Sequence, residues 1–206
     1  MEIIDKLKNC SIKYKEGEIM HAQCGRITLF SGGMFSGKTE ALFRELNRYK
    51  IRYSVVLFKP EIDNRYSKKA ASHNNQTFDS QNVTSVKDVD SWLEANEVDV
   101  IGIDEAQFLD ATEMSLVELA EKWANKGKVI FVAALDKDFE GKPFTGIPEF
   151  WVASDKGKKF NAICTQCGED ASFSHRTVDS DDKILVGGAD AYEALCRACY
   201  LKIANK

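Results

Sequence analysis

The chain has 206 residues, of which 44% are hydrophobic and 29% are charged, and its formal net charge is -4 with a pI near 5.5. This size and composition suit a soluble globular protein with one core and a small appendage. An acidic chain lacks the basic face that neutralises many phosphates, so a nucleic-acid polymer is a disfavoured partner. The longest apolar runs, 54–58 and 129–135, are far shorter than a membrane span, and residues 1–23 lack the apolar segment of a secretory signal. We therefore expect a cytoplasmic protein with no membrane partner.

Along the chain, residues 1–24 show no clear period and are predicted to be a short polar extension, helical in part. From Gly25 onwards apolar runs alternate with segments of helical period. The runs that predict strands are 26–32, 54–60, 98–106 and 128–135. The segments that predict helices are 38–51, 83–96 and 112–127, the last with Thr112 as N-cap and Gly127 just past its end, while 63–76 reads as an exposed loop. Continuous apolar strands that alternate with helices indicate a mainly parallel sheet covered on both faces.

The pattern changes near Phe160, where the apolar runs shorten and paired cysteines begin. We therefore predict three parts: an N-terminal extension at 1–24, an α/β domain at 25–159 and a smaller unit at 160–206.

The segment GGMFSGKT at 32–39 fits the phosphate-loop pattern G-x-x-x-x-G-K-[ST]. Its glycines let the backbone N–H groups surround phosphate oxygens, Lys38 supplies positive charge, and Thr39 offers a hydroxyl to Mg²⁺. The N-terminus of the following helix adds a partial positive charge. With a predicted strand before the loop and a helix after it, the chain is expected to bind a nucleoside triphosphate on a P-loop (RecA-like) fold.

Two adjacent carboxylates, Asp104 and Glu105, follow the apolar run VIGI. An acid at that end of a parallel strand lies beside the phosphate loop, so Asp104 is the expected partner of Mg²⁺. Glu105 could activate a water, as in an ATPase, or accept the proton of a substrate hydroxyl, as in a kinase. The letters DEAQ also occur in helicases, but a helicase needs a second lobe for which too little chain remains.

Two C-x-x-C pairs, CTQC at 164–167 and CRAC at 196–199, suit one tetrahedral Zn²⁺ with four thiolate ligands. Four cysteines leave no position for water, which predicts a structural site. Cys10 and Cys24 fit no metal spacing and are expected to be ordinary thiols, and His175 between the pairs is not needed as a ligand. The segment ILVGGADAYEALC at 184–196 is expected to form a lid over an acceptor substrate.

Taken together, GGMFSGKT, DNRYS, GIDEAQF, ALDKDFEGKPF, CTQC and VGGADAYEALCRACY resemble the cellular (type II) thymidine kinases, whose lasso loop is held by zinc. The resemblance runs from about Gly25 to Tyr200, in the order and spacing of that family. It implies transfer of the γ-phosphate of ATP to the 5′-hydroxyl of thymidine, with deoxyuridine as a further acceptor, in deoxynucleoside salvage. It also implies Mg²⁺ in catalysis, structural Zn²⁺, a homotetramer and feedback inhibition by dTTP.

The resemblance assigns site residues position by position. Glu105 matches the general base, and Lys38 and Arg65 match cations that offset charge on the phosphoryl group. The positions that match the ATP and Mg²⁺ site are Gly32, Gly33, Met34, Phe35, Ser36, Gly37, Lys38, Thr39, Asp63, Asn64, Arg65, Asp104, Glu105, Ala106 and Gln107.

A second set of positions matches the thymidine site, where flat apolar side chains would hold the base. They are Met34, Phe108, Leu135, Phe139, Phe144, Ser174, Lys183, Ile184, Leu185, Val186, Gly187 and Tyr192. Ser174 stands where threonine is expected, and Phe139 and Phe144 each have an ordinary core position as the alternative. The rivals to the kinase are a P-loop ATPase without a nucleoside acceptor and a zinc-knuckle module that binds nucleic acid with the nucleotide as a switch.

Overall fold

A computed structural model describes residues 13–15, 18–20, 25–62, 69–71, 77–178 and 188–204. Six strands form one sheet in the order β10–β3–β9–β8–β4–β7, and every neighbouring pair is parallel. Their bounds are β3 Arg26–Gly32, β4 Val55–Pro60, β7 Gln81–Val83, β8 Val100–Ile103, β9 Val129–Leu135 and β10 Lys156–Phe160. The prediction of a mainly parallel sheet is confirmed.

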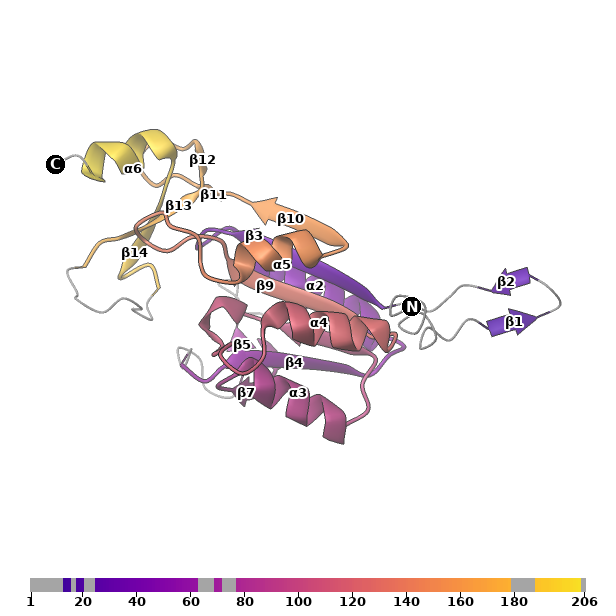
Figure 1. Ribbon diagram of the computed structural model, residues 1–206. Helices are drawn as coiled ribbons and strands as arrows, with labels where there is room; N and C mark the ends of the chain where they lie inside the picture. The colour runs from indigo at the N-terminus through magenta and orange to yellow at the C-terminus, as the bar shows by residue number, and fades with distance from the viewer. Residues whose placement is uncertain are drawn as a thin grey trace.

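Helices cover both faces of this sheet (Figure 1). On one face lies α2 (Lys38–Lys50), and on the other lie α3 (Val86–Ala95), α4 (Leu116–Asn125) and α5 (Ile147–Ala153). Successive strand residues point to opposite faces, so in β9 Ile130 and Val132 pack under α4 and α5 while Phe131 packs under α2. The central strands therefore need apolar residues at nearly every position, which explains their continuous apolar runs.

The close approach of α2 to the sheet depends on Gly102 in β8. A Cβ atom at this position would lie 2.7 Å from Cδ1 of Leu46, inside the van der Waals contact distance. The missing side chain lets α2 lie directly over the strand, and this places the N-terminus of α2 at the carboxyl edge of the sheet.

Helix α4 begins later than its sequence pattern predicts. Ser115, not Thr112, is the N-cap: its hydroxyl accepts a hydrogen bond from the Glu118 N–H, and the Glu118 carboxylate accepts one from the Ser115 N–H. This reciprocal pair satisfies two free donors at once, which a lone Thr112 side chain cannot do. The N–H of Thr112 donates instead to Asp110 Oδ1 at 2.9 Å.

The structure corrects several other local predictions. Two short strands, β5 (Lys69–Ala71) and β6 (Thr77–Asp79), form an antiparallel pair in and beside the segment read as a loop. The segment predicted to be helical from residue 83 begins with the end of β7, and its helix starts at Val86. Within the extension, β1 (Lys13–Lys15) and β2 (Glu18–Met20) pair as antiparallel strands where a helix was expected.

The segment after β10 forms a small unit with its own apolar cluster, called here the cysteine module. It comprises β11 (Ala162–Ile163), β12 (Asp170–Ala171), β13 (Phe173–Arg176), β14 (Tyr192–Leu195) and α6 (Arg197–Ala204). Strand β11 pairs with β12 and β13 pairs with β14, both antiparallel. None of the helices in the described part of the chain has the length and apolarity that crossing a bilayer requires.

Candidate functional site

The phosphate-loop segment forms a tight turn between β3 and α2 at the carboxyl edge of the sheet (Figure 1). Gly32 and Gly37 have φ angles of 146° and 85°, which favour glycine. A Cβ atom on Gly32 would lie 2.3 Å from the Phe160 carbonyl oxygen, so this position has no room for a side chain. Gly37 is the N-cap of α2 and has no side chain that could block the helix N-terminus. The turn therefore leaves that end of the helix open to an anion.

Lys38 and Thr39 begin α2 beneath the loop. The Lys38 ammonium is buried and donates to the Gly33 carbonyl oxygen at 2.6 Å. Burial lowers the pKa of Lys38, although the carboxylates of Glu105, Asp104 and Asp136 act in the opposite direction. The amine is thus held inside the loop, where it would meet phosphate oxygens.

Asp104 lies directly after β8, next to the loop. Its Oδ1 accepts a hydrogen bond from the Thr39 hydroxyl at 3.2 Å, so two oxygen atoms of the type that Mg²⁺ prefers lie side by side. Burial raises the pKa of Asp104 to about 7, and the negative charge of Glu105 adds to that effect. The donor set fits a divalent cation, which would offset the cost of burying the carboxylate.

Glu105 is held in an unusual backbone conformation, with a φ of 49°. Its Oε2 accepts a hydrogen bond from Gln107 Nε2 at 2.6 Å, and Gln107 Oε1 accepts one from the Leu135 N–H at 2.9 Å. Gln107 therefore connects the Glu105 carboxylate to the end of β9. A left-handed backbone at a non-glycine residue is typical of functional sites, where surrounding contacts maintain it.

The predicted acceptor residues form two aromatic groups. Phe108 and Phe144 meet edge to face with ring centroids 6.0 Å apart, and Phe144 also packs against the core beneath α5. The second group consists of Phe139 and Tyr192, with Arg176 between them. The guanidinium of Arg176 lies 3.8 Å from the centroid of the Phe139 ring and 5.8 Å from that of Tyr192.

Arg176 is a residue that the sequence pattern did not reveal. It is 8% exposed and lies at the end of β13, opposite Tyr192 in the β13–β14 register. A buried guanidinium on an aromatic face is a stabilising arrangement that also fixes the ring. No motif or spacing in the sequence distinguishes this arginine from the other arginines of the chain.

Met34 and Ser174 connect the loop with the cysteine module. The Met34 N–H donates to the Ser174 hydroxyl at 2.9 Å, and Ser174 is buried. Two groups of predicted site residues, Asp63–Arg65 and Lys183–Gly187, lie outside the described residues.

The four cysteines of the C-x-x-C pairs lie together. The sulfur atoms of Cys164, Cys167, Cys196 and Cys199 all lie within 4.8 Å of one another. Tetrahedral Zn²⁺ with bonds of about 2.3 Å requires sulfur atoms about 3.8 Å apart, and the Cys167 and Cys196 sulfurs are separated by 3.6 Å. Backbone N–H groups, that of Cys196 first, lower the pKa of Cys164 to about 6, whereas the hydrogen bond with the Cys196 sulfur raises the pKa of Cys199 to about 12. The four thiols therefore share their protons, and a bound metal would hold all of them as thiolates. These residues can hold a zinc ion.

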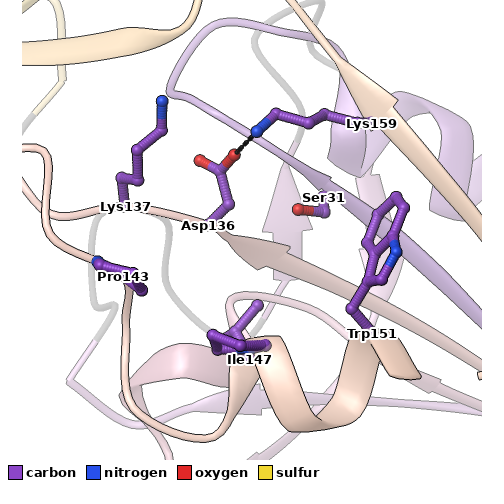
Figure 2. A pocket seen from close by; sticks show the side chains of 8 residues that line it. Ser31, Asp136, Lys137, Pro143, Ile147, Trp151 and Lys159 are labelled. Atoms are coloured by element: carbon purple, nitrogen blue, oxygen red, sulfur yellow. Dashed lines mark ion pairs between the residues drawn. The ribbon is translucent and has the colours of Figure 1, made fainter. Parts of the chain in front are cut away.

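A separate pocket of about 320 Å³ lies on the α5 side of the sheet, beside the ends of β3 and β9 (Figure 2). It is lined by Ser31, Asp136, Lys137, Pro143, Ile147, Pro148, Trp151 and Lys159. Figure 2 shows the Asp136 carboxylate directed at Lys159, whose Nζ lies 2.6 Å from Asp136 Oδ2. The Nζ of Lys137 lies over the ring of Phe173, 4.2 Å from its centroid. Among the predicted thymidine-site residues that the structure describes, none lines this pocket.

The parallel sheet, the glycine turn into α2 and the buried Lys38 define a P-loop α/β protein. The family model described as thymidine kinase matches residues 25–200. A thymidine kinase of Bacteroides thetaiotaomicron is 44% identical over 86% of this chain and 88% of its own length. Those of Rhodothermus sp. and Myxoma virus are each 42% identical over 85% of this chain, and over 81% and 96% of their own lengths. The chain belongs to the thymidine kinase family of enzymes.

Proposed function

We propose that the protein transfers the γ-phosphate of ATP to the 5′-hydroxyl of thymidine and releases dTMP and ADP. The observation that carries this proposal is the position of Glu105. Its carboxylate is fixed through Gln107 to β9, and it directly follows Asp104, which contacts Thr39 of the phosphate loop. A general base is thereby fixed next to the place where a triphosphate would end. The related proteins, which are thymidine kinases, supply the identity of the acceptor.

The loop at 32–39 would hold the phosphates through its N–H groups, the N-terminus of α2 and the Lys38 ammonium. Mg²⁺ would be held through Thr39 and Asp104, and when bound it neutralises charge on the phosphate oxygens. Lys38 contributes its positive charge from a dry site, where electrostatic interactions are stronger than in water.

Glu105 would accept the proton of the 5′-hydroxyl as its oxygen attacks the γ-phosphorus in line and ADP leaves. We propose that Arg65 offsets the negative charge that develops on the transferring phosphoryl group. We assign Asp63, Asn64, Ala106 and Gln107 to the part of the site that binds ATP. Water in place of the hydroxyl would make the protein an ATPase. The two aromatic groups argue against that rival because an ATPase binds adenine alone and needs no surface for a second, acceptor base.

Thymidine would lie against Phe108, Leu135, Phe139, Phe144 and Tyr192, with Met34 near its methyl group. Ser174 and the backbone of Lys183–Gly187 would read the polar edge of the base. The cysteine module would anchor that segment as a lasso, with zinc as a structural ion. Closing the lasso would exclude water and limit ATP hydrolysis.

The family resemblance extends the proposal beyond the single chain. We infer a cytoplasmic homotetramer of deoxynucleoside salvage, supplying DNA synthesis and inhibited by dTTP in the lasso site. We further assign residues 25–159 to the nucleotide-binding domain and 160–206 to the zinc-binding domain. Deoxyuridine, which differs from thymidine by one methyl group, is a second acceptor.

The acceptor atom can be identified with three nucleosides and ATP labelled at its γ-phosphate. We expect label to appear on thymidine and on 3′-deoxythymidine, and none on 5′-deoxythymidine, which lacks the attacking oxygen. Label on 5′-deoxythymidine, or on inorganic phosphate alone, would contradict the proposal.

A further inference from the structure

Four consecutive residues of the phosphate loop contact the cysteine module or the residue that leads into it. Gly32 approaches the carbonyl of Phe160, and a Cβ atom on Gly33 would lie 3.3 Å from the Ser174 hydroxyl. Met34 donates its N–H to the same hydroxyl. Phe35 packs against the apolar cluster that contains Cys164 and Cys199. A phosphate loop needs only its own strand and helix, so this continuous contact is an addition to the motif.

Phe35 is the most informative of these residues. Its φ of 62° lies in the left-handed region, which a bulky aromatic residue rarely adopts. Such a conformation persists only where surrounding contacts maintain it. The module supplies contacts of this kind, because Phe35 packs on the cluster of Ala162, Cys164, Ala171, Ala194, Leu195 and Cys199.

Ser174 provides a second connection, which leads back to the cysteines through the backbone. It lies in β13 opposite Ala194 of β14, and Cys196 follows the last residue of β14. A shift of β14 on loss of the metal would therefore move the hydroxyl that holds Met34. Both connections start at metal-binding cysteines and end in the loop.

We propose that the metal-loaded cysteine module holds the phosphate loop in its nucleotide-binding conformation through Phe35 and Ser174. Zinc then acts on the ATP side of the site as well as on the lasso. This inference rests on the proposed function in one respect, namely that the loop binds ATP. Because coupling between two sites is reciprocal, nucleotide in the loop must strengthen zinc binding by the same factor that zinc strengthens nucleotide binding.

The test measures zinc retention in the full-length, zinc-loaded protein. A chromophoric chelator competes for the zinc, with and without saturating MgADP and with no nucleoside, so that the lasso substrate plays no part. We expect MgADP to raise the apparent zinc affinity at least about fivefold, the lower end of ordinary allosteric coupling. Binding of MgADP itself is followed in parallel with a fluorescent ADP analogue.

The variants Phe35→Ala, Phe35→Gly and Ser174→Ala should each lose most of this effect. Glycine adopts the left-handed conformation freely. If Phe35→Gly loses the effect of MgADP on zinc affinity, the connection is therefore the ring contact and not the backbone angle. The matched control is Ile203→Ala, which trims another partly buried side chain of the same cluster from α6. Ile203→Ala can change the zinc affinity of the protein without nucleotide. MgADP should still raise the zinc affinity of this variant by the same factor as in wild type.

The outcomes separate the two proposals. If wild-type protein binds MgADP but its zinc retention does not change, the inference is overturned and the proposed function stands. If zinc-loaded wild-type protein does not bind MgADP, the proposed function fails, and the inference fails with it. Should the Phe35 variants not fold, Ser174→Ala decides, since retention of the full effect of MgADP in that variant would overturn the inference.

Discussion

Glu105 is the residue on which the proposed chemistry depends. Its carboxylate accepts a short hydrogen bond from Gln107, which is itself fixed by the Leu135 N–H. Its left-handed backbone turns the chain at the end of β8 and is maintained by these contacts. Asp104 and Glu105 are adjacent carboxylates in different surroundings, one buried against Thr39 and the other partly open to an acceptor, so they can perform different tasks.

The substitution Glu105→Gln should lower turnover by about 10²–10⁴-fold, the usual contribution of a general base. The amide can still accept the hydrogen bond from Gln107, so MgADP affinity should stay within about twofold of wild type by titration. Glu113→Gln, an exposed site on the loop before α4, is the control and should leave turnover unchanged. Near-normal turnover in Glu105→Gln would remove the general-base assignment.

Arg176 should act on the nucleoside alone, because it contacts Phe139 and Tyr192. Arg176→Ala should raise the KM for thymidine by about tenfold, as expected for loss of a buried cation–aromatic contact, and leave the KM for ATP unchanged. The KM of Arg176→Lys for thymidine should lie between the values of wild type and Arg176→Ala. His175→Ala, on the opposite face of β13, is the control. A parallel rise in both KM values with a lower melting temperature would show a purely structural role.

The residues with a chemical motif could be predicted from sequence, and those placed by tertiary contact could not. Lys38, Thr39, Asp104 and the four cysteines were found because their spacing is dictated by phosphate and metal geometry, and the structure brings each set together. Arg176 is placed by Phe139 and Tyr192, which lie 37 and 16 positions away. The contact of Phe35 with the cysteine cluster depends on residues more than a hundred positions away. A single sequence carries no record of such pairs.

At the scale of the elements, a buried carboxylate joins α3 to α4. Asp90 of α3 is 2% exposed and accepts hydrogen bonds from Lys122 at 2.6 Å, Lys87 at 3.0 Å and Trp123 Nε1 at 3.1 Å. Burial alone would raise the pKa of Asp90, but these hydrogen bonds together outweigh it and hold the pKa below its usual value. The two helices are thereby fixed relative to each other on one face of the sheet.

The variant Asp90→Asn should lower the free energy of unfolding by about 2 kcal/mol, the range for hydrogen bonds to a charged group. Because the folded pKa is depressed, the stabilisation is complete above 3.8, the ordinary pKa of an aspartate, and is lost as the pH falls through the folded pKa. Urea denaturation at pH 7, 5 and 3 measures the difference in free energy of unfolding between wild type and Asp90→Asn. This difference should be equal at pH 7 and pH 5 and smaller at pH 3. Glu94→Gln, at an exposed pair with the same Lys122, should have a much smaller effect. A difference that grows in acid would contradict this account.

The central strands and helices were predictable because burial on both faces imposes a continuous apolar pattern. Strand β10 was missed because KGKKF at the sheet edge carries lysines, which protect an exposed edge from pairing with another chain. Helix α5 has only seven residues, too few to establish a period. The N-cap of α4 lies at Ser115 and not at Thr112 because the Ser115–Glu118 pair forms a capping box, which satisfies two N–H donors.

On the scale of the whole molecule, the parallel sheet presents the phosphate loop and Asp104 at one edge, and the cysteine module closes against that edge (Figure 1). The module has a small apolar cluster of its own, in which two of the four cysteines are buried. The core of a unit of this size is small, so a metal held by the four cysteines would add to its stability.

The variant Cys164→Ser should reduce zinc affinity by more than about tenfold. Removing a ligand weakens metal binding more than removing a residue that only orients a ligand through a hydrogen bond. Thymidine binding should weaken with it, because the lasso loses its anchor. Zinc content by atomic absorption and thymidine affinity by calorimetry provide the test. The control is Cys24→Ser, which should keep one zinc per chain, and unchanged zinc content in Cys164→Ser would contradict the four-cysteine site.

The central claim is that the loop holds ATP for a nucleoside acceptor. The most direct measurement is ATP consumption with Mg²⁺ in three parallel reactions: without nucleoside, with thymidine and with deoxycytidine. We predict turnover with thymidine alone, with thymidine 5′-monophosphate formed in equal amount to ADP. ATP consumption that is the same in all three reactions would show a P-loop ATPase and contradict the assignment of Glu105, the aromatic groups and the lasso to a nucleoside.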